Sequence, residues 1–204
     1  GERNDDAVFM ISELARFFRF FLSKGRTVIS IKDELQHAKS YMNIQKVRHK
    51  ETFSMVFDVD PSVVSCCTVK LILQPILENA INYGVAGMDD CGEIRIVGRQ
   101  RDGRILLSVI DNGMGMPEEE ARSLLTDNDR VHKHGSGVGL INVNKRIQVL
   151  FGKEYGLTVK SEPDEGTEVI ICIPAVPYTE ESRKILEKGY LFSKEELDTE
   201  GAQG

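Results

Sequence analysis

The first long segment of the chain carries apolar residues at the spacing of an α-helix. Residues 7–24 contain no Gly or Pro, and Ile11, Leu14, Phe18 and Phe21 follow one another at steps of three and four. Such steps place side chains on one face of a helix, as in the seam of a helical bundle. An apolar face of this size is stable in water only when it packs against another apolar surface. The pattern leaves two such surfaces open: the next helix of the same chain, or a second subunit.

A second helix is predicted at about 31–49, after a loop around Gly25. Ser30, followed three residues later by Asp33, resembles a capping box, in which side chains satisfy the free N–H groups at the start of a helix.

The remaining elements mix helices and strands without regular alternation. Steps of three and four indicate helices, and period-two alternation indicates strands. The turn Asp102-Gly103 joins two strands, and Gly152 ends the last long helix. The predicted helices cover 69–83, 118–125 and 139–151, and the predicted strands cover 51–60, 93–99, 104–110, 156–161 and 167–173. The order favours an α+β fold, a two-layer sandwich whose mixed sheet is covered on one face by helices.

Charge and cysteine content limit the classes of ligand. The 204 residues have a formal net charge of -6, which disfavours binding to nucleic acid. An anionic nucleotide remains compatible where backbone amides receive it. Cys66, Cys67, Cys91 and Cys172 form no CxxC pair, which argues against structural zinc and favours reduced thiols. The sequence shows no apolar run of the ~20 residues that span a bilayer.

A glycine-containing segment, DNGMG, directly follows the predicted strand 104–110. Asp111 at the end of a buried strand is poorly hydrated and needs a hydrogen-bond donor, which the amino group of a base can supply. Gly113 and Gly115 allow a tight turn against a flat ligand. A plain turn explains the same residues, so this segment alone does not decide between the two.

A second such segment, GSGVGL, occupies 135–140 at the start of a predicted helix. Free amides and the helix dipole favour phosphate at such a place. The spacing differs from the Rossmann fingerprint, and the Lys-Ser/Thr ending of a P-loop is missing. The polar stretch that ends at Gly137 has the composition of a mobile lid. A third segment, Gly166-Thr167, opens the last strand and has the simple explanation of a hairpin turn.

Polar residues also interrupt the apolar helix predicted at 69–83. Asn79 and Asn82 are three residues apart and share a face, with Glu78 beside them. Oxygen ligands of this kind, completed by waters and phosphates, suit Mg²⁺. Exposed surface positions are the other explanation.

Together these segments resemble a known family. LQPILENAINYG, DNGMGM, GSGVGLINVNKRIQVLFG and the final Gly-Thr resemble the N, G1 and G2 boxes and terminal Gly-Thr of the GHKL (Bergerat) ATP-binding fold, shared by gyrase, Hsp90, MutL and histidine kinases. Within that fold they are similar to the LytS/YehU-type sensor histidine kinases. The upstream segment resembles the region between phosphoacceptor helix and ATP domain, so the resemblance extends to about residue 175.

The resemblance implies ATP and Mg²⁺ as ligands. Asn79 would coordinate Mg²⁺ between the phosphates, and Glu78 and Asn82 would support the ion or its waters, so Glu78 and Asn79 are the candidate catalytic residues. Asp111 would accept from the adenine amino group. The other expected ATP-binding residues are Gly113, Gly115, Lys133, Gly135, Gly137, Val138, Gly139, Leu140 and Thr167.

Three of the matched positions have simpler explanations. Lys133 is also explained as an ordinary solvated lysine of the lid. Asn142 and Arg146 match family positions, and helix packing or a surface ion pair explains them equally well.

The reaction implied is transfer of the ATP γ-phosphoryl group to a protein histidine and then to a response regulator. Pro75 stands where hydrolytic members carry the Glu that activates water, so steady hydrolysis is not expected. The family's phosphoacceptor motif, PHFLFN-like, does not occur in this sequence. His37, His49, His132 and His134 are all interpreted as surface residues. A GHKL ATPase, an anti-sigma-type serine kinase and a non-catalytic nucleotide-binding module are the alternatives.

The resemblance also divides the chain. Residues 1–50 would be the end of the dimerisation and phosphoacceptor segment with a linker helix, 51–177 the ATP-binding domain, and 178–204 a weakly packed, charged helical tail. The implied location is the cytoplasmic side of a bacterial inner-membrane sensor, with membrane contact only through N-terminal segments outside this sequence. A second subunit and a response regulator are the implied partners.

Overall fold

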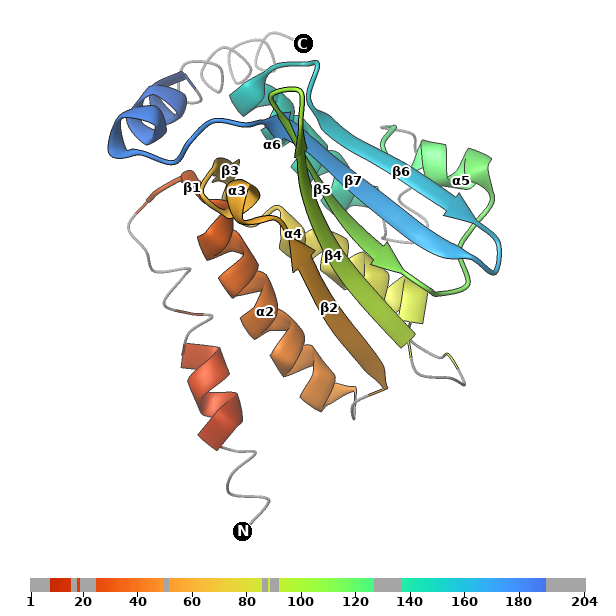
Figure 1. The fold of residues 1–204 in the computed structure, drawn as a ribbon. Helices are drawn as coiled ribbons and strands as arrows, with labels where there is room; N and C mark the ends of the chain where they lie inside the picture. The colour runs from red at the N-terminus through yellow and green to blue at the C-terminus, as the bar shows by residue number, and fades with distance from the viewer. Residues whose placement is uncertain are drawn as a thin grey trace, which may run out of the picture.

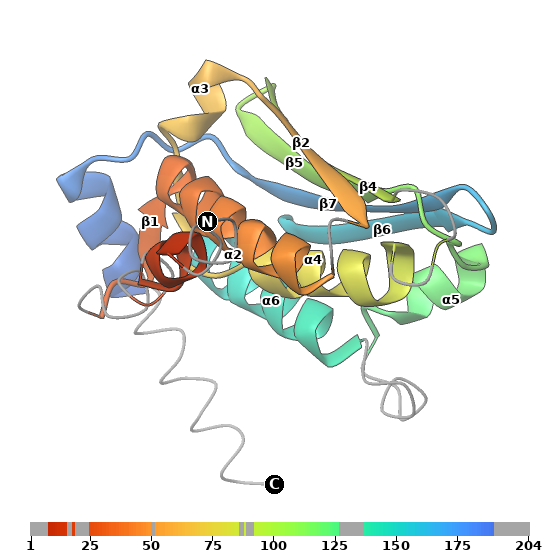
Figure 2. The same ribbon diagram turned by 90° about the horizontal axis from the view of Figure 1, so that it is seen from below.

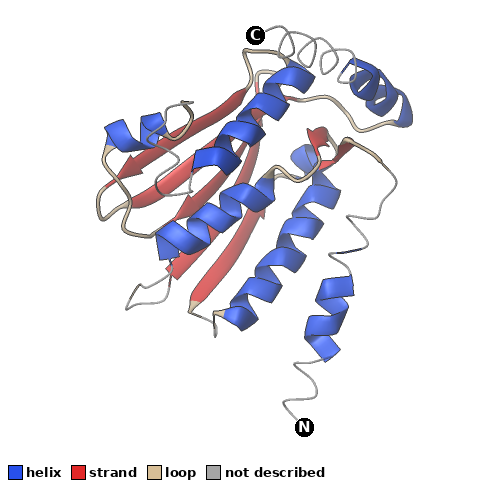
Figure 3. Ribbon diagram, turned by 180° about the vertical axis from the view of Figure 1, so that it is seen from behind, coloured by secondary structure: helices blue, strands red, loops and turns tan. Residues whose placement is uncertain are grey.

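A five-stranded sheet packs against a layer of helices (Figure 1). The structure is a computed structural model, and it describes residues 8–15, 18, 25–49, 52–85, 88, 92–126 and 137–189. The main helices are α2 (Ile31–Arg48), α4 (Leu73–Asn79) and α6 (Gly137–Phe151). They lie together on one side of the sheet in Figure 2 and run side by side across it in Figure 3. The predicted two-layer sandwich is confirmed.

The sheet is mixed, as predicted. Its strands are β2 (Phe53–Val59), β4 (Gly92–Arg101), β5 (Arg104–Asp111), β6 (Gly156–Glu162) and β7 (Gly166–Pro174), in the spatial order β2-β4-β5-β7-β6. The β2–β4 pair is parallel, and the other pairs are antiparallel. Asp102 and Gly103 have φ of 47° and 71° and form the β4–β5 turn. All five strands lie within two residues of their predicted bounds.

The helix α2 begins where its cap residues predict. Ser30 Oγ accepts a hydrogen bond from the Asp33 N–H at 3.1 Å. Ile31, Ala38 and Met42 are fully buried in the same apolar cluster as the inner face of the sheet. The helix α2 is therefore part of the core.

The predicted helix 69–83 is wrong at its start. Cys67–Val69 forms β3, which pairs antiparallel with β1 (Val28–Ser30), and α4 begins only at Leu73. At Ala80 it passes into a π-helix, η1 (Ala80–Val85). Pairing with a strand distant in sequence overrides the local helical pattern, and periodicity cannot show such a partner. The strand β1 and the short helix α3 (Pro61–Val64) are likewise not predicted from the sequence.

The first helix presents its apolar side outward. Residues 8–15 and 18 are helical, and Ile11, Leu14 and Phe18 are 67%, 45% and 53% exposed. Glu13 is buried and accepts from Asn43 Nδ2 of α2 at 3.4 Å. The sequence leaves open whether this face packs on the next helix or on a second subunit. The exposure of these side chains shows that they do not pack into the core of this chain. No described helix is both long and apolar enough to cross a membrane.

The C-terminal tail is held more firmly than its charged composition suggests. Residues 180–189 form a helix, and Glu187 Oε1 accepts from the N–H groups of Thr27 at 3.0 Å and Val28 at 3.3 Å. Arg183, with its side chain 11% exposed, pairs with both Glu187 and Glu180. Residues 190–204 of the predicted tail lie outside the described residues.

The three cysteines that the structure describes are free thiols. Cys66 and Cys67 are buried and Cys172 is partly exposed. Burial raises the pKa of the Cys66 and Cys67 thiols, so both are protonated at neutral pH. Cys91 lies outside the described residues.

Glu34 fastens α4 to α2. Its side chain is fully buried, and its carboxylate accepts from the N–H groups of Leu71 at 2.9 Å, Ile72 at 2.8 Å and Leu73 at 2.9 Å. These N–H groups stand at the start of α4, where a helix leaves donors unpaired. Burial raises the pKa of Glu34, and the three donors and the Arg146 charge oppose that shift.

Arg146 holds the same loop from α6. Its guanidinium donates to the carbonyl oxygens of Lys70 at 2.5 Å and Leu71 at 3.4 Å. Of the two explanations that the sequence left open, the structure gives Arg146 a packing role. Asn142 is exposed.

Replacing Glu34 by Gln should destabilise the fold by about 2–4 kcal/mol, because the amide NH₂ would face a backbone donor and leave it unpaired. Chemical denaturation measures this loss. Asp33→Asn makes the same carboxylate-to-amide change at the neighbouring, exposed position and should cost less than about 1 kcal/mol. Equal stability of the two variants would contradict the role of Glu34.

Candidate functional site

A cavity of about 240 Å³ opens between the helices and the sheet. One wall comes from α4 and η1, and the floor comes from β5 and β7. The loop 112–117 and α5 (Glu118–Ser123) form the other side. The lining residues are Ile76, Asn79, Ala80, Tyr83, Gly84, Val109, Asp111, Gly115, Met116, Pro117, Glu120, Leu124, Leu140, Thr167 and Val169. The walls are mostly apolar with a few polar groups, which is typical of a site for a small organic ligand.

Asp111 is the buried charge of this cavity. It is 5% exposed, and its Oδ1 accepts from the Gly113 N–H at 3.0 Å. Burial raises the pKa of Asp111 to about 6, although hydrogen bonds from the Gly113 and Thr167 backbone oppose the shift. The carboxylate is therefore ionised at neutral pH while it remains poorly hydrated. A ligand with an amino group would supply a further donor to it.

Glycine lets three backbone segments meet at Asp111. A Cβ on Gly84 would lie 2.5 Å from Asp111 Oδ1, and one on Gly113 would lie 2.3 Å from the Gly84 carbonyl oxygen. Gly115 has φ of 60°, and its Cβ would lie 1.9 Å from the carbonyl oxygen of Glu162. Any larger residue would displace the loop or the helix. The glycines of the DNGMG segment thus allow close approach to other backbone of this chain, and their predicted role against a flat ligand stays a prediction.

Thr167 provides a second acceptor beside Asp111. Ser161 Oγ donates to the Gly166 carbonyl oxygen at 2.8 Å and accepts from the Met116 N–H at 3.0 Å. A hydroxyl has one hydrogen, so Thr167 Oγ1, 2.8 Å from Ser161 Oγ, donates to it. Because its one hydrogen goes to Ser161, the Thr167 hydroxyl can only accept a hydrogen bond from a ligand. The Gly166-Thr167 segment is more than a hairpin turn, because its hydroxyl belongs to the network that holds the loop.

The predicted residues of the polar helix separate in the structure. Asn79 lines the cavity, whereas Asn82 is exposed on η1. Glu78 lies on the side of α4 that faces α2, where it accepts from Gln74 Nε2 at 2.9 Å. Burial and, after it, the Glu78 charge raise the pKa of Tyr41 on α2. Neighbouring residues of a helix point about 100° apart, which separates Glu78 from Asn79. The change from α-helix to π-helix at Ala80 lies between Asn79 and Asn82.

The predicted phosphate segment lies only partly within the described residues. Gly137 starts α6, Leu140 lines the cavity, and Val138 is 42% exposed. A Cβ on Gly139 would lie 3.3 Å from the Cβ of Pro75, so this glycine brings α6 close to α4. Lys133 and Gly135 lie outside the described residues, as do His132 and His134.

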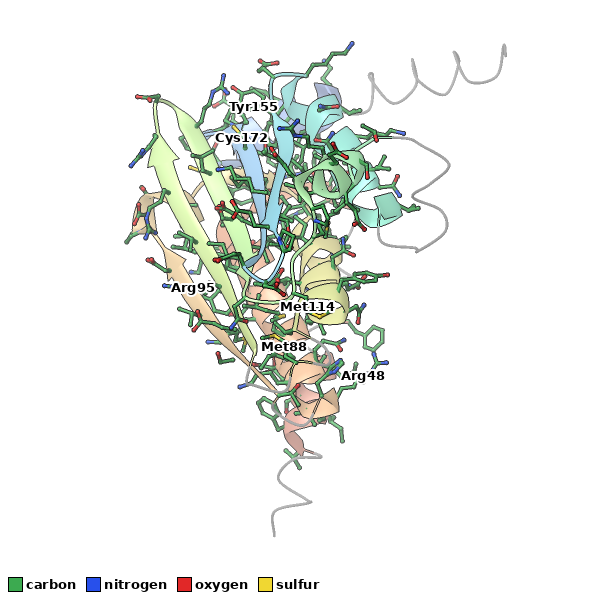
Figure 4. All side chains as sticks on the ribbon, turned by 90° about the vertical axis from the view of Figure 1, so that its right-hand side faces the viewer. Arg48, Met88, Arg95, Met114, Tyr155 and Cys172 are labelled. Carbon is green, nitrogen blue, oxygen red and sulfur yellow. The ribbon has the colours of Figure 1, made fainter. Side chains whose placement is uncertain are left out.

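Sequence reasoning missed most of the apolar lining. Ile76, Ala80 and Tyr83 follow the helical spacing around Asn79 and could have been found from it. Met116 and Leu124 could not, because loop geometry brings them to the cavity. Met114, beside the yellow helix in Figure 4, is 68% exposed.

His37 corrects another expectation. The sequence favours a surface position for His37, but the residue is 3% exposed between α2 and α4, and its Nε2 lies 3.2 Å from Gln74 Oε1. The error arises because α4 covers this face of α2, which the sequence of α2 alone does not indicate.

Two family models match the chain. The model for histidine kinase-, DNA gyrase B- and HSP90-like ATPases matches residues 68–177, and a histidine kinase model matches residues 1–53. The first range contains every element that lines the cavity.

Curated relatives are similar over most of this chain. Sensor histidine kinase YesM of Bacillus subtilis is 34% identical over 81% of the chain, which covers 27% of that protein. Sensor protein LytS of Staphylococcus saprophyticus is 31% identical over 81% of the chain, which covers 28% of that protein. The chain thus spans about a quarter of the length of these relatives.

Solved structures share the fold at low identity. Full-length ShkA in complex with AMPPNP has a TM-score of 0.58 at 18% identity, over 87% of this chain and 38% of that chain. Histidine kinase ThkA in complex with the response regulator TrrA has a TM-score of 0.54 at 18% identity, over 82% of this chain and 48% of that chain. At this identity the likeness supports the fold alone. On the family model that matches more than half of it, the chain belongs to the histidine kinase-, DNA gyrase B- and HSP90-like ATPases.

Proposed function

We propose that this chain is the ATP-binding catalytic part of a sensor kinase that transfers the γ-phosphoryl group of ATP to a histidine of an upstream helix. The observation that carries the proposal is the buried Asp111 carboxylate, which shares one cavity with Thr167 and Asn79. Two acceptors on the floor suit the amino group of adenine, and an amide oxygen on the wall suits a cation between phosphates.

The base of the nucleotide would lie between η1 and the sheet. Asp111 would accept from its amino group, Thr167 would add a second acceptor, and Val109, Val169 and Leu140 would contact the ring. Tyr83, 48% exposed, would cover the ring from the solvent side. These contacts exclude water and so strengthen the hydrogen bonds at the carboxylate.

The phosphates would extend toward Asn79 and the start of α6. Gly137 and Gly139, with Gly135 before them, would offer backbone amides, and Lys133 would supply a cation. Of the three predicted magnesium residues only Asn79 lines the cavity, so Asn79 would hold Mg²⁺ and waters would complete its coordination. When bound, Mg²⁺ neutralises charge that develops on the transferred group. The protein's own contribution is to bind and orient the nucleotide.

Pro75 supports phosphotransfer over hydrolysis. Proline has no group that can accept a proton, and its ring lies against Gly139 of α6. A water at this position would find no base in that side chain. A histidine delivered by another helix needs no such base, because it is itself the nucleophile.

The organisation of the whole receptor is also a proposal. We assign residues 1–50 to the dimerisation segment and linker, 51–177 to the ATP-binding domain and 178–204 to the tail. The exposed apolar side of the first helix suits contact with a second subunit. A response regulator would take the phosphoryl group, on the cytoplasmic side of a bacterial inner membrane.

Asp111→Asn should weaken binding of a non-hydrolysable ATP analogue by about ten- to a hundredfold, because a charged hydrogen bond is lost. Calorimetric titration measures this. In the unaltered chain, affinity should fall about tenfold between pH 7.5 and pH 5, because protonation of a carboxyl whose pKa is about 6 competes with the ligand.

The Asp111→Asn variant should lose most of that pH dependence. Asp164→Asn, at an exposed turn position with φ of 64° that Asn also tolerates, should bind normally. Unchanged affinity in Asp111→Asn would show that the cavity does not take the base.

Asn79→Ala should remove the increase in affinity that Mg²⁺ gives, because the cation loses its protein ligand. Titration of the analogue in Mg²⁺ and in EDTA separates this effect from binding of the base. Affinity in EDTA should stay within about twofold of the unaltered chain. A full magnesium effect in Asn79→Ala would place the ion elsewhere.

The 204-residue chain should take up no acid-labile label from γ-labelled ATP, because the phosphoacceptor is expected in the upstream helix. A longer chain of the receptor that includes this helix should become labelled, and Asn79→Ala in it should not. Labelling of a histidine within the 204 residues would contradict the proposed direction of transfer.

A further inference from the structure

Three side chains connect α2 to the end of α4 in a chain of hydrogen bonds. Gln74 Nε2 donates to Glu78 Oε1 at 2.9 Å, and Gln74 Oε1 lies 3.2 Å from His37 Nε2. A carboxylate only accepts, so the Gln74 amide must turn its NH₂ toward Glu78 and its oxygen toward His37. His37 Nε2 must then carry a hydrogen. Each hydrogen bond thus fixes the orientation of the next group.

The environment of His37 favours a neutral ring that donates from Nε2 to Gln74 Oε1. Burial lowers the pKa of His37, the hydrogen bond with Gln74 opposes the shift, and the Lys70 charge adds to it. A neutral ring has one N–H, and Gln74 receives it. His37 therefore acts as a single donor from α2, one helical turn after Glu34.

The chain of hydrogen bonds ends where the helix changes its geometry. Asn79 is the last residue of α4, and the π-helix η1 begins at Ala80. Long π-helices are rare, and where they occur surrounding contacts must hold them. Neighbouring residues of an α-helix point about 100° apart, so a contact that fixes Glu78 toward α2 also fixes the direction of Asn79. The rotation of α4 at Glu78 therefore decides whether Asn79 faces the cavity.

Other contacts fix the far ends of this helical stretch. Glu34 holds the N–H groups at the start of α4, and Gly84 at the end of η1 lies against Asp111 and Gly113. Between these two points, Glu78 is the side chain next to Asn79, and Gln74 is its partner one turn earlier.

We propose that His37 and Gln74 are positioning residues of the nucleotide site, and that the linker helix α2 uses them to set the direction of Asn79 at the junction of α4 and η1. The proposal rests on the function proposed above for Asn79. It gives α2, which continues from the upstream part of the chain, a direct mechanical connection to the phosphate end of the cavity.

The test compares His37→Leu, which removes the donor, with His37→Gln, whose amide can still donate to Gln74. Both are titrated with a non-hydrolysable ATP analogue in Mg²⁺ and in EDTA. His37→Leu should lose about three- to tenfold of the magnesium-dependent affinity, the range for one hydrogen bond. Its affinity in EDTA should stay unchanged, because Gly84 and Asp111 hold the base end separately. His37→Gln should keep most of the magnesium effect.

His49→Leu is the matched control. His49 lies at the other end of α2, with its ring centroid 6.3 Å from that of Phe53, and its replacement should leave both affinities unchanged. Thermal unfolding of each variant without nucleotide reports stability separately. Gln74→Leu should behave as His37→Leu, because it breaks both hydrogen bonds of the chain.

The outcomes separate this inference from the proposed function. An unaltered chain that shows no magnesium effect would overturn both. A normal magnesium effect in His37→Leu would overturn the positioning role alone, and so would an equal loss in Mg²⁺ and EDTA, which indicates general loss of structure. A His37→Gln variant as weak as His37→Leu would show that hydrogen-bond donation is not the property that matters.

Discussion

A carboxylate among apolar side chains costs several kcal/mol unless donors surround it, and Glu34 is surrounded in this way. The helix that it caps, α4, has seven residues and is too short to be stable by itself. The cap, the Arg146 contact from α6 and the packing of Gly139 on Pro75 place α4 between its two neighbours. The order of the helix layer therefore depends on one buried charge, and the cavity depends on that order.

On the sheet side of the cavity, glycines determine how closely the backbone segments approach one another. Gly84 and Gly113 let η1 approach the end of β5 so closely that a methyl group on either would collide with the other segment. This contact buries Asp111 and raises its pKa. The close approach of η1 to the end of β5 therefore both packs the two segments together and removes water from the Asp111 carboxylate. The site therefore holds a poorly hydrated carboxylate that can accept a further hydrogen bond from a ligand.

Local sequence patterns were sufficient to predict the elements whose type is not overridden by pairing with a distant segment. The five strands, the capped α2 and the glycine turns followed from spacing and turn residues. The start of α4 did not, because β3 is stabilised by pairing with β1. The burial of His37 and Glu34 does not follow from the sequence of α2, since only the position of α4 shows that they are buried. At the site, Asp111 and Asn79 were identifiable from their segments, whereas the loop residue Met116 required the fold.

The polar residues of α2 and α4 explain how α2 is held as part of the core. Apolar packing alone would hold α2 in place but would tolerate small rotations, because dispersion contacts have little directionality. Hydrogen bonds at Glu34 and His37 are directional, and they act on both ends of α4. Rotation or translation of α2 must therefore either break buried hydrogen bonds or move α4 with it. Since breaking them costs more than small shifts in packing, α4 should follow α2 as one unit.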